Sequence, residues 1–175
     1  GRVYWNGDAT PYACRRDAAV QRALGEAAQE HAGRYVHAPG SVRTASGGPF
    51  QVFTPFFRAW QARPWDPWPG PGGAAVAADP GEGVPAGGRP LMAPGEEPAA
   101  ERLEAFLDRV DRYPAERDRP DLDTTSRLSA DLKFGTISPR TVVRRVEGPG
   151  EGRAAFIRQL AWREFYAHLL VAFPE

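Results

Sequence analysis

The chain has 175 residues, and its 22 Lys and Arg residues balance its 22 Asp and Glu residues, so its formal net charge is zero. This balance excludes a uniformly basic coat for nucleic acid but not a local basic face. The single cysteine, Cys14, excludes an intrachain disulfide framework and a metal site built on cysteine pairs. The apolar runs are too short to span a membrane, and the first residues lack a signal-peptide layout, so we expect an intracellular, cytoplasmic protein.

Both ends of the chain suggest an internal fragment of a longer protein. The sequence lacks an initiator Met, and it stops at Phe173-Pro174-Glu175, directly after a strongly apolar helix pattern. Residues 66–98 contain 8 Gly and 8 Pro and show no apolar periodicity. We predict that this stretch is a long, partly extended linker; an ordered surface loop wrapped on a larger body is the alternative.

The residues before this linker predict a mixture of elements. Apolar spacing predicts a helix over 15–31, with Gly33 as its stop, followed by a short strand at 35–37. Pro39-Gly40 predicts a turn. A second helix is predicted from Thr54-Pro55 through Trp60, with Thr54 as its N-terminal cap.

The residues after the linker predict helices only. A helix over 99–113 would carry Leu103, Phe106, Leu107 and Val110 on one face. Next comes a polar turn from Thr124 that enters a short helix ended by Gly135. Ser138-Pro139 would cap a helix over 140–146. The longest helix pattern covers 151–173, and Pro174 ends it.

One polar cluster, Thr124 to Ser129, is a candidate anion site. Four hydroxyl groups and one guanidinium lie within six residues, directly before an amphipathic helix. These donors suit a phosphate or pyrophosphate, although a helix cap rich in Thr and Ser is the structural alternative.

The longest helix carries a second candidate site. Gln159, Trp162, Arg163 and Tyr166 follow the spacing i, i+3, i+4 and i+7, so they share one face, and Phe156 extends it by a turn. Such a face can stack on a planar ring and hydrogen-bond its edge. The structural alternative is a set of amphipathic side chains at a domain interface.

The charge pattern adds a basic region next to this face. Seven basic residues lie between Lys133 and Arg163, and only Glu147 and Glu151 oppose them. A basic region beside an aromatic and polar pocket suits a nucleic-acid backbone with an inserted base, although solvated helix faces explain most such runs.

In order, these pieces resemble the DNA photolyase/cryptochrome family, most closely a class I cyclobutane pyrimidine dimer photolyase. The resemblance covers nearly the whole chain except the linker, and the ordered set of motifs carries it rather than any single one. The matching segments are Tyr4-Trp5-Asn6, Pro11-Tyr12, Arg16-Asp17, Pro39-Gly40, Val52 to Trp60, Tyr113, Arg117-Asp118, Thr125 to Ser129, Leu132 to Gly135, Ile137 to Arg140, and Leu160 to Tyr166.

The resemblance implies a mainly α fold in three parts. Residues 1–65 would be the end of a doubly wound α/β antenna domain and the start of a connector. Residues 66–98 would be the Gly/Pro-rich linker, and residues 99–175 the first part of an all-helical domain that binds FAD and DNA.

The resemblance also implies which residues bind ligands. The residues expected to contact FAD are Tyr113, Thr125, Ser126, Arg127, Leu128, Ser129, Phe156, Gln159 and Arg163. The residues expected to contact DNA are Arg117, Gln159, Trp162, Arg163 and Tyr166, with Trp162 stacking on a flipped dimer. Gln159 stands where many cyclobutane-dimer enzymes have Glu.

The implied activity is a carbon–carbon lyase reaction, in which reduced FAD donates an electron under light to a pyrimidine dimer in UV-damaged DNA. The alternatives are a cryptochrome-type blue-light photosensor, a (6-4) photolyase, or a non-catalytic helical DNA-binding fragment. Trp162 favours repair over sensing, because a sensor does not need to stack a dimer.

Other expectations concern what the chain lacks. The resemblance implies that most of the antenna domain and the later half of the flavin domain are missing, so we expect no catalytic residue here and neither tight FAD binding nor repair by the piece alone. No metal is required. The antenna chromophore, folate or deazaflavin, is left open, although Tyr12-Ala13 replaces the Asn-Glu pair of many folate binders. We expect a monomer.

Overall fold

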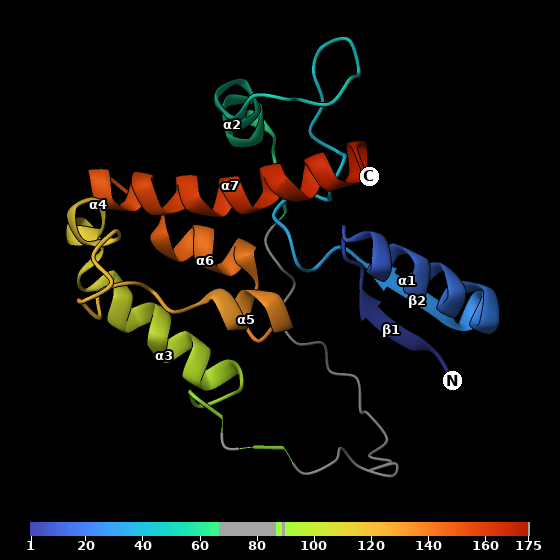
Figure 1. Cartoon of the computed structure of the whole chain (residues 1–175), viewed down its shortest axis with the longest axis horizontal. Coiled ribbons are helices and arrows are strands. Elements are labelled where there is room, and N and C mark those ends of the chain that lie inside the picture. The colour runs from blue at the N-terminus through green and yellow to red at the C-terminus, as the bar shows by residue number, and fades with distance from the viewer. Residues whose placement is uncertain (67–86, 89, 175) are drawn as a thin grey trace.

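The structure, a computed structural model, describes residues 1–66, 87, 88 and 90–174. Most of the predicted linker at 66–98 therefore lies outside the described residues. Figure 1 shows a small unit that contains the strands at one end and a group of helices arranged around the long helix α7.

The N-terminal unit consists of β1 (Val3–Asn6), α1 (Pro11–Leu24), the short 3-10 helix η1 (Gly25–Ala27) and β2 (Ala28–His31). The two strands pair in parallel, with Val3 opposite Ala28 and Asn6 opposite His31. A parallel pair joined by a helix is the repeating unit of doubly wound α/β sheets.

Two predictions for the first 37 residues are wrong. The predicted helix over 15–31 begins earlier, at Pro11, and ends at Leu24, because Gly25 has a φ of 55° that a continuing helix excludes. The following residues form β2, since their partner β1 fixes an extended conformation that their own polar sequence does not indicate. The predicted strand at 35–37 is irregular.

The connector contains the turn at Pro39-Gly40, as predicted, with the Ser41 amide donating to the Ala38 carbonyl at 3.0 Å. Helix α2 (Phe53–Ala62) confirms the second predicted helix. The prediction of Thr54 as its cap is wrong: the helix begins at Phe53, so that this ring can pack inward, and Val52 occupies the cap position without a side-chain hydrogen bond.

The predicted helix over 99–113 is divided into α3 (Glu96–Leu107), the 3-10 helix η2 (Val110–Arg112) and α4 (Tyr113–Glu116). At this division α7 approaches η2 closely. A Cβ atom on Gly152 would lie only 2.0 Å from the Val110 carbonyl oxygen, so the contact needs a glycine. Leu103, Phe106 and Val110 are buried, as the predicted apolar face requires.

The last three helices confirm the sequence prediction closely. They are α5 (Ser129–Phe134), α6 (Pro139–Val146) and α7 (Glu151–Ala172). Gly135 ends α5 in the left-handed conformation. The hydroxyl of Ser138 caps α6 by accepting a hydrogen bond from the Arg140 amide at 3.3 Å.

Helix α7 lies between two layers, with α2 on one side and α6 on the other (Figure 1). One apolar cluster joins them, and its largest fully buried apolar side chains include Phe56 from α2, Phe106 from α3 and Val142 from α6. None of the helices in the described ranges is long and apolar enough to cross a membrane.

A buried carboxylate connects α7 to the connector. Glu164 is 0% exposed, and its Oε1 accepts a hydrogen bond from the Val36 amide. Its Oε2 accepts from the His37 amide at 3.1 Å and from the Trp60 indole at 2.7 Å. Burial raises the pKa of Glu164 to about 7, although these three donors favour the ionised form.

The first testable prediction concerns this carboxylate. Both carboxylate oxygens of Glu164 accept a hydrogen bond from an N–H group. In Glu164→Gln, the side-chain NH₂ group would therefore face a backbone or indole N–H in either orientation of the amide. We expect the free energy of unfolding at pH 8 to fall by about 1–3 kcal/mol, measured by chemical denaturation.

Glu101→Gln, on the exposed face of α3, makes the same chemical change without burial. This control should alter the free energy of unfolding by less than about 0.5 kcal/mol. Equal stabilities of the two variants would contradict the role given to Glu164.

Candidate functional site

Helix α7 presents the predicted polar and aromatic face to the outside of the core. Gln159, Trp162 and Arg163 are half-buried, and Tyr166 is 58% exposed. The opposite side of α7 buries its side chains, including Leu160 at 5% exposure. The four residues share one face of α7, as their spacing predicts, and the structure shows that this face is less buried than the opposite side.

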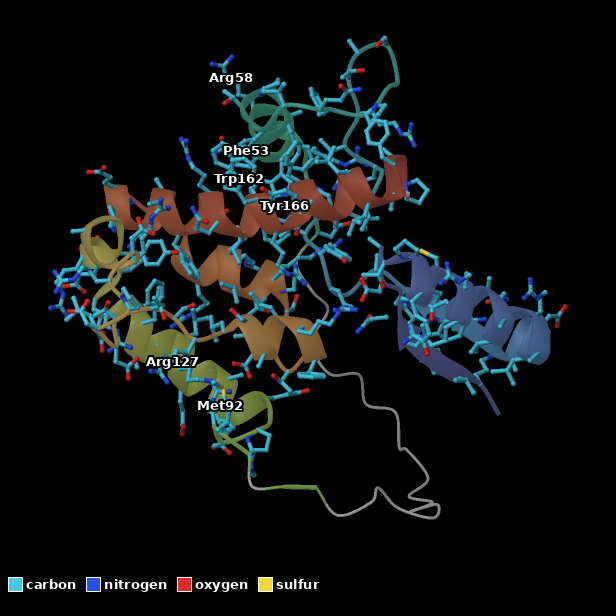
Figure 2. All side chains as sticks on the ribbon, viewed as in Figure 1. Phe53, Arg58, Met92, Arg127, Trp162 and Tyr166 are labelled. Atoms are coloured by element: carbon cyan, nitrogen blue, oxygen red, sulfur yellow. The ribbon has the colours of Figure 1, made fainter. Side chains whose placement is uncertain are left out.

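Trp162 stands at the edge of this face that is nearest α2. Its ring stacks on Phe53 with 3.7 Å between the ring centroids and 7° between the planes. Tyr166 lies beside it at 5.6 Å and 28° (Figure 2). The result is a half-buried aromatic stack between α2 and α7.

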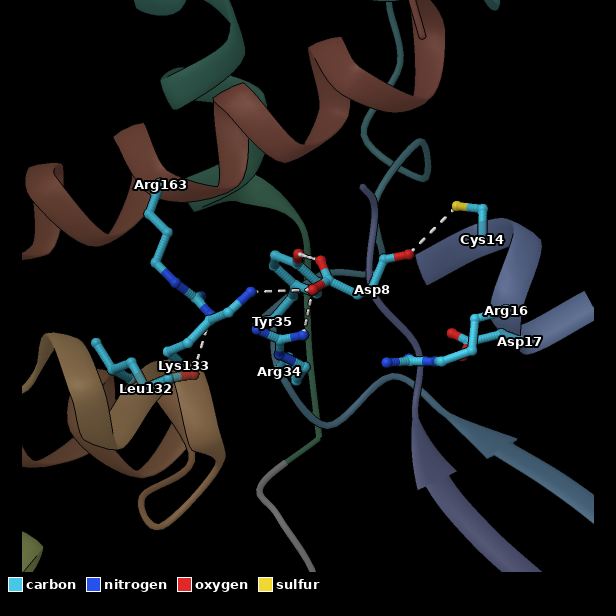
Figure 3. A network of polar contacts seen from close by, with 9 residues as sticks. All are labelled: Asp8, Cys14, Arg16, Asp17, Arg34, Tyr35, Leu132, Lys133 and Arg163. Carbon is cyan, nitrogen blue, oxygen red and sulfur yellow. Dashed lines mark hydrogen bonds and ion pairs between the residues drawn. The ribbon is translucent and has the colours of Figure 1, made fainter. Parts of the chain in front are cut away.

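Arg163 occupies the other edge of the face and points toward α5 (Figure 3). Its guanidinium donates to the Leu132 carbonyl at 3.3 Å, and its central carbon lies 5.0 Å from the centroid of the Tyr35 ring. Burial lowers the pKa of Arg163, although the side chain stays charged. Within the described ranges no ion pair reaches its guanidinium.

Two of the predicted flavin contacts, Tyr113 and Phe156, lie in the core. Their rings meet edge to face at 5.3 Å, and Phe156 packs on Phe106 at 4.5 Å. Both are buried, at 9% and 5% exposure, and burial raises the pKa of Tyr113. These two residues form an apolar wall behind the α7 face rather than a freely exposed contact.

The run Thr125 to Ser129 has two kinds of side chain. The hydroxyl-bearing residues are half-buried or exposed, whereas Leu128 is 1% exposed and packs in the core, leaving only its backbone for a ligand. The hydroxyl of the preceding Thr124 is buried without a hydrogen-bond partner. This donor set fits a phosphate group, because hydroxyl and amide groups are its usual neutral ligands.

Arg127, in the same run, is already engaged. Its φ is 53°, and its guanidinium pairs with Asp123 at 2.6 Å. This partner was not predicted, although the i, i+4 spacing could have indicated it. An incoming phosphate must therefore compete with the Asp123 carboxylate for Arg127.

The structure does not bring all the predicted residues together. Arg127 and Trp162 lie on opposite sides of α7 (Figure 2). Arg117 follows α4 and lines a cleft of about 670 Å³ between α2, α6 and α7, whose lining includes Arg158 but not Trp162. Arg163 is the residue of the α7 face that extends toward α5, the helix that directly follows the Thr125–Ser129 run.

A polar network beside Arg163 was missed altogether. Asp8, in the loop after β1, accepts hydrogen bonds from Arg34, from Tyr35 at 3.2 Å and from Lys133 at 3.2 Å (Figure 3). Burial alone would raise the pKa of Asp8, but the hydrogen bonds and charges of Arg34 and Lys133 lower it to about 2. No local pattern indicates partners so far apart in the sequence.

Comparisons with known proteins show which family the chain resembles. The model of the DNA photolyase family matches residues 1–72. A deoxyribodipyrimidine photo-lyase from Halobacterium salinarum is 40% identical, and the alignment covers 97% of this chain and 41% of the relative. The chain thus spans about two fifths of the length of that relative.

Two solved structures share the fold. A bacterial class III photolyase from Agrobacterium tumefaciens has a TM-score of 0.78 and 29% identity, over 99% of this chain and 41% of the other. A cryptochrome from Synechocystis has a TM-score of 0.69 and 18% identity, over 96% and 41%, which shows a shared fold only.

The likeness to a class III enzyme leaves the predicted class I type without confirmation. The family model and the photo-lyase relatives together match nearly the whole chain, so the chain is similar to the DNA photolyase family along its length.

Proposed function

We propose that this chain is part of a photolyase that repairs cyclobutane pyrimidine dimers in DNA by light-driven electron transfer from reduced FAD. The observation that carries the proposal is the half-buried stack of Trp162 on Phe53, next to Arg163, on a helix of a chain similar to the DNA photolyase family. The complete native polypeptide would act as a monomer inside the cell.

FAD would lie with its phosphates against the loop before α5. Thr125, Ser126 and Ser129 would donate hydroxyl hydrogen bonds to its phosphates, and the unpartnered Thr124 hydroxyl supports a polar ligand there. Tyr113 and Phe156 would close the pocket as its apolar wall. When bound, reduced FAD supplies the electron that splits the dimer.

The residues of the chain would prepare the DNA for this chemistry. A dimer has to leave the duplex to reach the cofactor, and a damaged, poorly stacked base costs less to extrude. Trp162 would stack on the extruded dimer, and Arg163 would hold an anionic group beside it. The exposed Arg144 and the rim residue Arg117 support contacts with the DNA backbone.

Gln159 determines the finer choice of lesion in this proposal. Its half-buried amide lies on the same face as Trp162 and can both donate and accept hydrogen bonds at a pyrimidine edge. It carries no charge, unlike the Glu of many cyclobutane-dimer enzymes, and this difference also admits a (6-4) photoproduct as substrate.

The test is light-dependent repair by the complete native polypeptide. We expect blue or near-UV light to remove cyclobutane dimers from a defined oligonucleotide, with no loss of dimers in the dark. A parallel oligonucleotide with one (6-4) photoproduct tests the alternative lesion. Flavin photoreduction without repair of either lesion would indicate a photosensor and contradict the proposal.

A separate prediction concerns Trp162. In Trp162→Ala, loss of the stacking ring should weaken dark binding to dimer-containing DNA by about 1–3 kcal/mol, measured by titration with a labelled oligonucleotide. Trp162→Phe should recover part of this loss, since a phenyl ring can still stack on Phe53 and on a base.

Tyr12→Ala serves as the control for the loss of an exposed aromatic ring, because Tyr12 is 70% exposed on α1. This variant should bind the same oligonucleotide as tightly as the wild type. Unchanged affinity in Trp162→Ala would contradict the stacking role.

A further inference from the structure

Tyr35 lies between two charged groups at the junction of the βαβ unit and the helices (Figure 3). It is 6% exposed, its hydroxyl donates to Asp8, and its ring face holds the Arg163 guanidinium at 5.0 Å. We propose that Tyr35 is a positioning residue that holds Arg163 ready for a phosphate-bearing ligand at the α7 face. This inference rests on the proposed function.

Asp8 fixes the hydroxyl end of the tyrosine. Its own carboxylate is held by Arg34 from the loop after β2 and by Lys133 from α5, at 3.2 Å for Lys133. The Asp8 side chain is only 10% exposed, so water competes weakly for these bonds. The orientation of the Tyr35 ring is therefore set by three segments that are distant in the sequence.

The same network leaves the charge of Arg163 available. Asp8 is the acidic group of the network, and Arg34 and Lys133 already compensate it. Arg163 receives a ring face instead of a carboxylate, together with one hydrogen bond to the Leu132 carbonyl. Most of its N–H donors therefore stay available for an anion, in a fixed fork geometry.

Holding Arg163 in advance favours ligand binding. A free arginine loses rotamer freedom when it is immobilised by a ligand, and that entropy loss reduces the affinity. A cation above an aromatic ring is attracted by the negative face of the ring, so Tyr35 restricts the side chain without neutralising it. A simple packing residue would need only the volume of the ring, not its electrostatics.

Fluorination of the ring separates these two roles. In the complete native polypeptide, Tyr35 is replaced by Phe and then by Phe with one, two and three fluorine atoms, which weaken the negative ring face and barely change its size. We expect Tyr35→Phe to bind more weakly than the wild type, because the ring loses its hydrogen bond to Asp8, and fluorination to lower the affinity further, stepwise, to about a fifth to a tenth of the Phe value.

Two ligands are titrated separately, FAD with the flavin-depleted protein and a dimer-containing oligonucleotide with the flavin-loaded protein. A stepwise loss in either titration supports the inference and identifies which phosphate-bearing ligand Arg163 meets. The same series in an Arg163→Ala background should be flat, because the ring then has no cation to hold. Placed at the exposed Tyr12, the fluorinated residues should have no effect.

Flat affinities for both ligands at position 35 overturn the inference, and so does a stepwise loss that persists in Arg163→Ala. The repair assay on the wild type is independent of these titrations. Failed repair with a stepwise series contradicts the proposed function alone, whereas intact repair with a flat series contradicts the role of Tyr35 alone.

Discussion

The carboxylate of Glu164 is the constraint on which the position of α7 depends. A fully buried acid is costly, and this one is tolerated because the Val36 and His37 amides and the Trp60 indole all donate to it. These donors come from the connector and from α2. The Glu164 side chain therefore fixes α7 against the connector and against α2. The rotation of α7 that results sets the direction in which the neighbouring side chains on this helix point.

The polar core extends from this point along the helix. His168 lies one turn further, where its Nδ1 bonds to the Glu164 carbonyl at 2.8 Å and its Nε2 accepts from the Val42 amide at 3.2 Å. Burial lowers the pKa of His168 and of His37, so both favour the neutral form that can accept a hydrogen bond. Backbone groups of the irregular connector thereby find partners on α7 instead of in a sheet.

Periodic segments could be predicted from the sequence, and segments that depend on distant partners could not. Helix α6 carries strong apolar spacing, and Ser138 marks its start by its own hydrogen bond. By contrast, the strand Ala28–His31 has no apolar alternation and exists because β1 lies beside it. In the candidate site the α7 face was predictable from spacing, but Tyr35 was not, because its contact with Arg163 spans most of the chain.

Two acidic groups, Glu164 and Asp8, explain how one helix serves both stability and binding. Glu164 points inward to neutral N–H donors, whereas the adjacent Arg163 points outward to a ring beside Asp8, whose charge other residues compensate. Because these two neighbours on α7 face different surroundings, the buried Glu164 carboxylate finds its hydrogen-bond partners without the Arg163 guanidinium. The chain thus builds its core and keeps a cation available at the surface where Trp162 presents an aromatic stack.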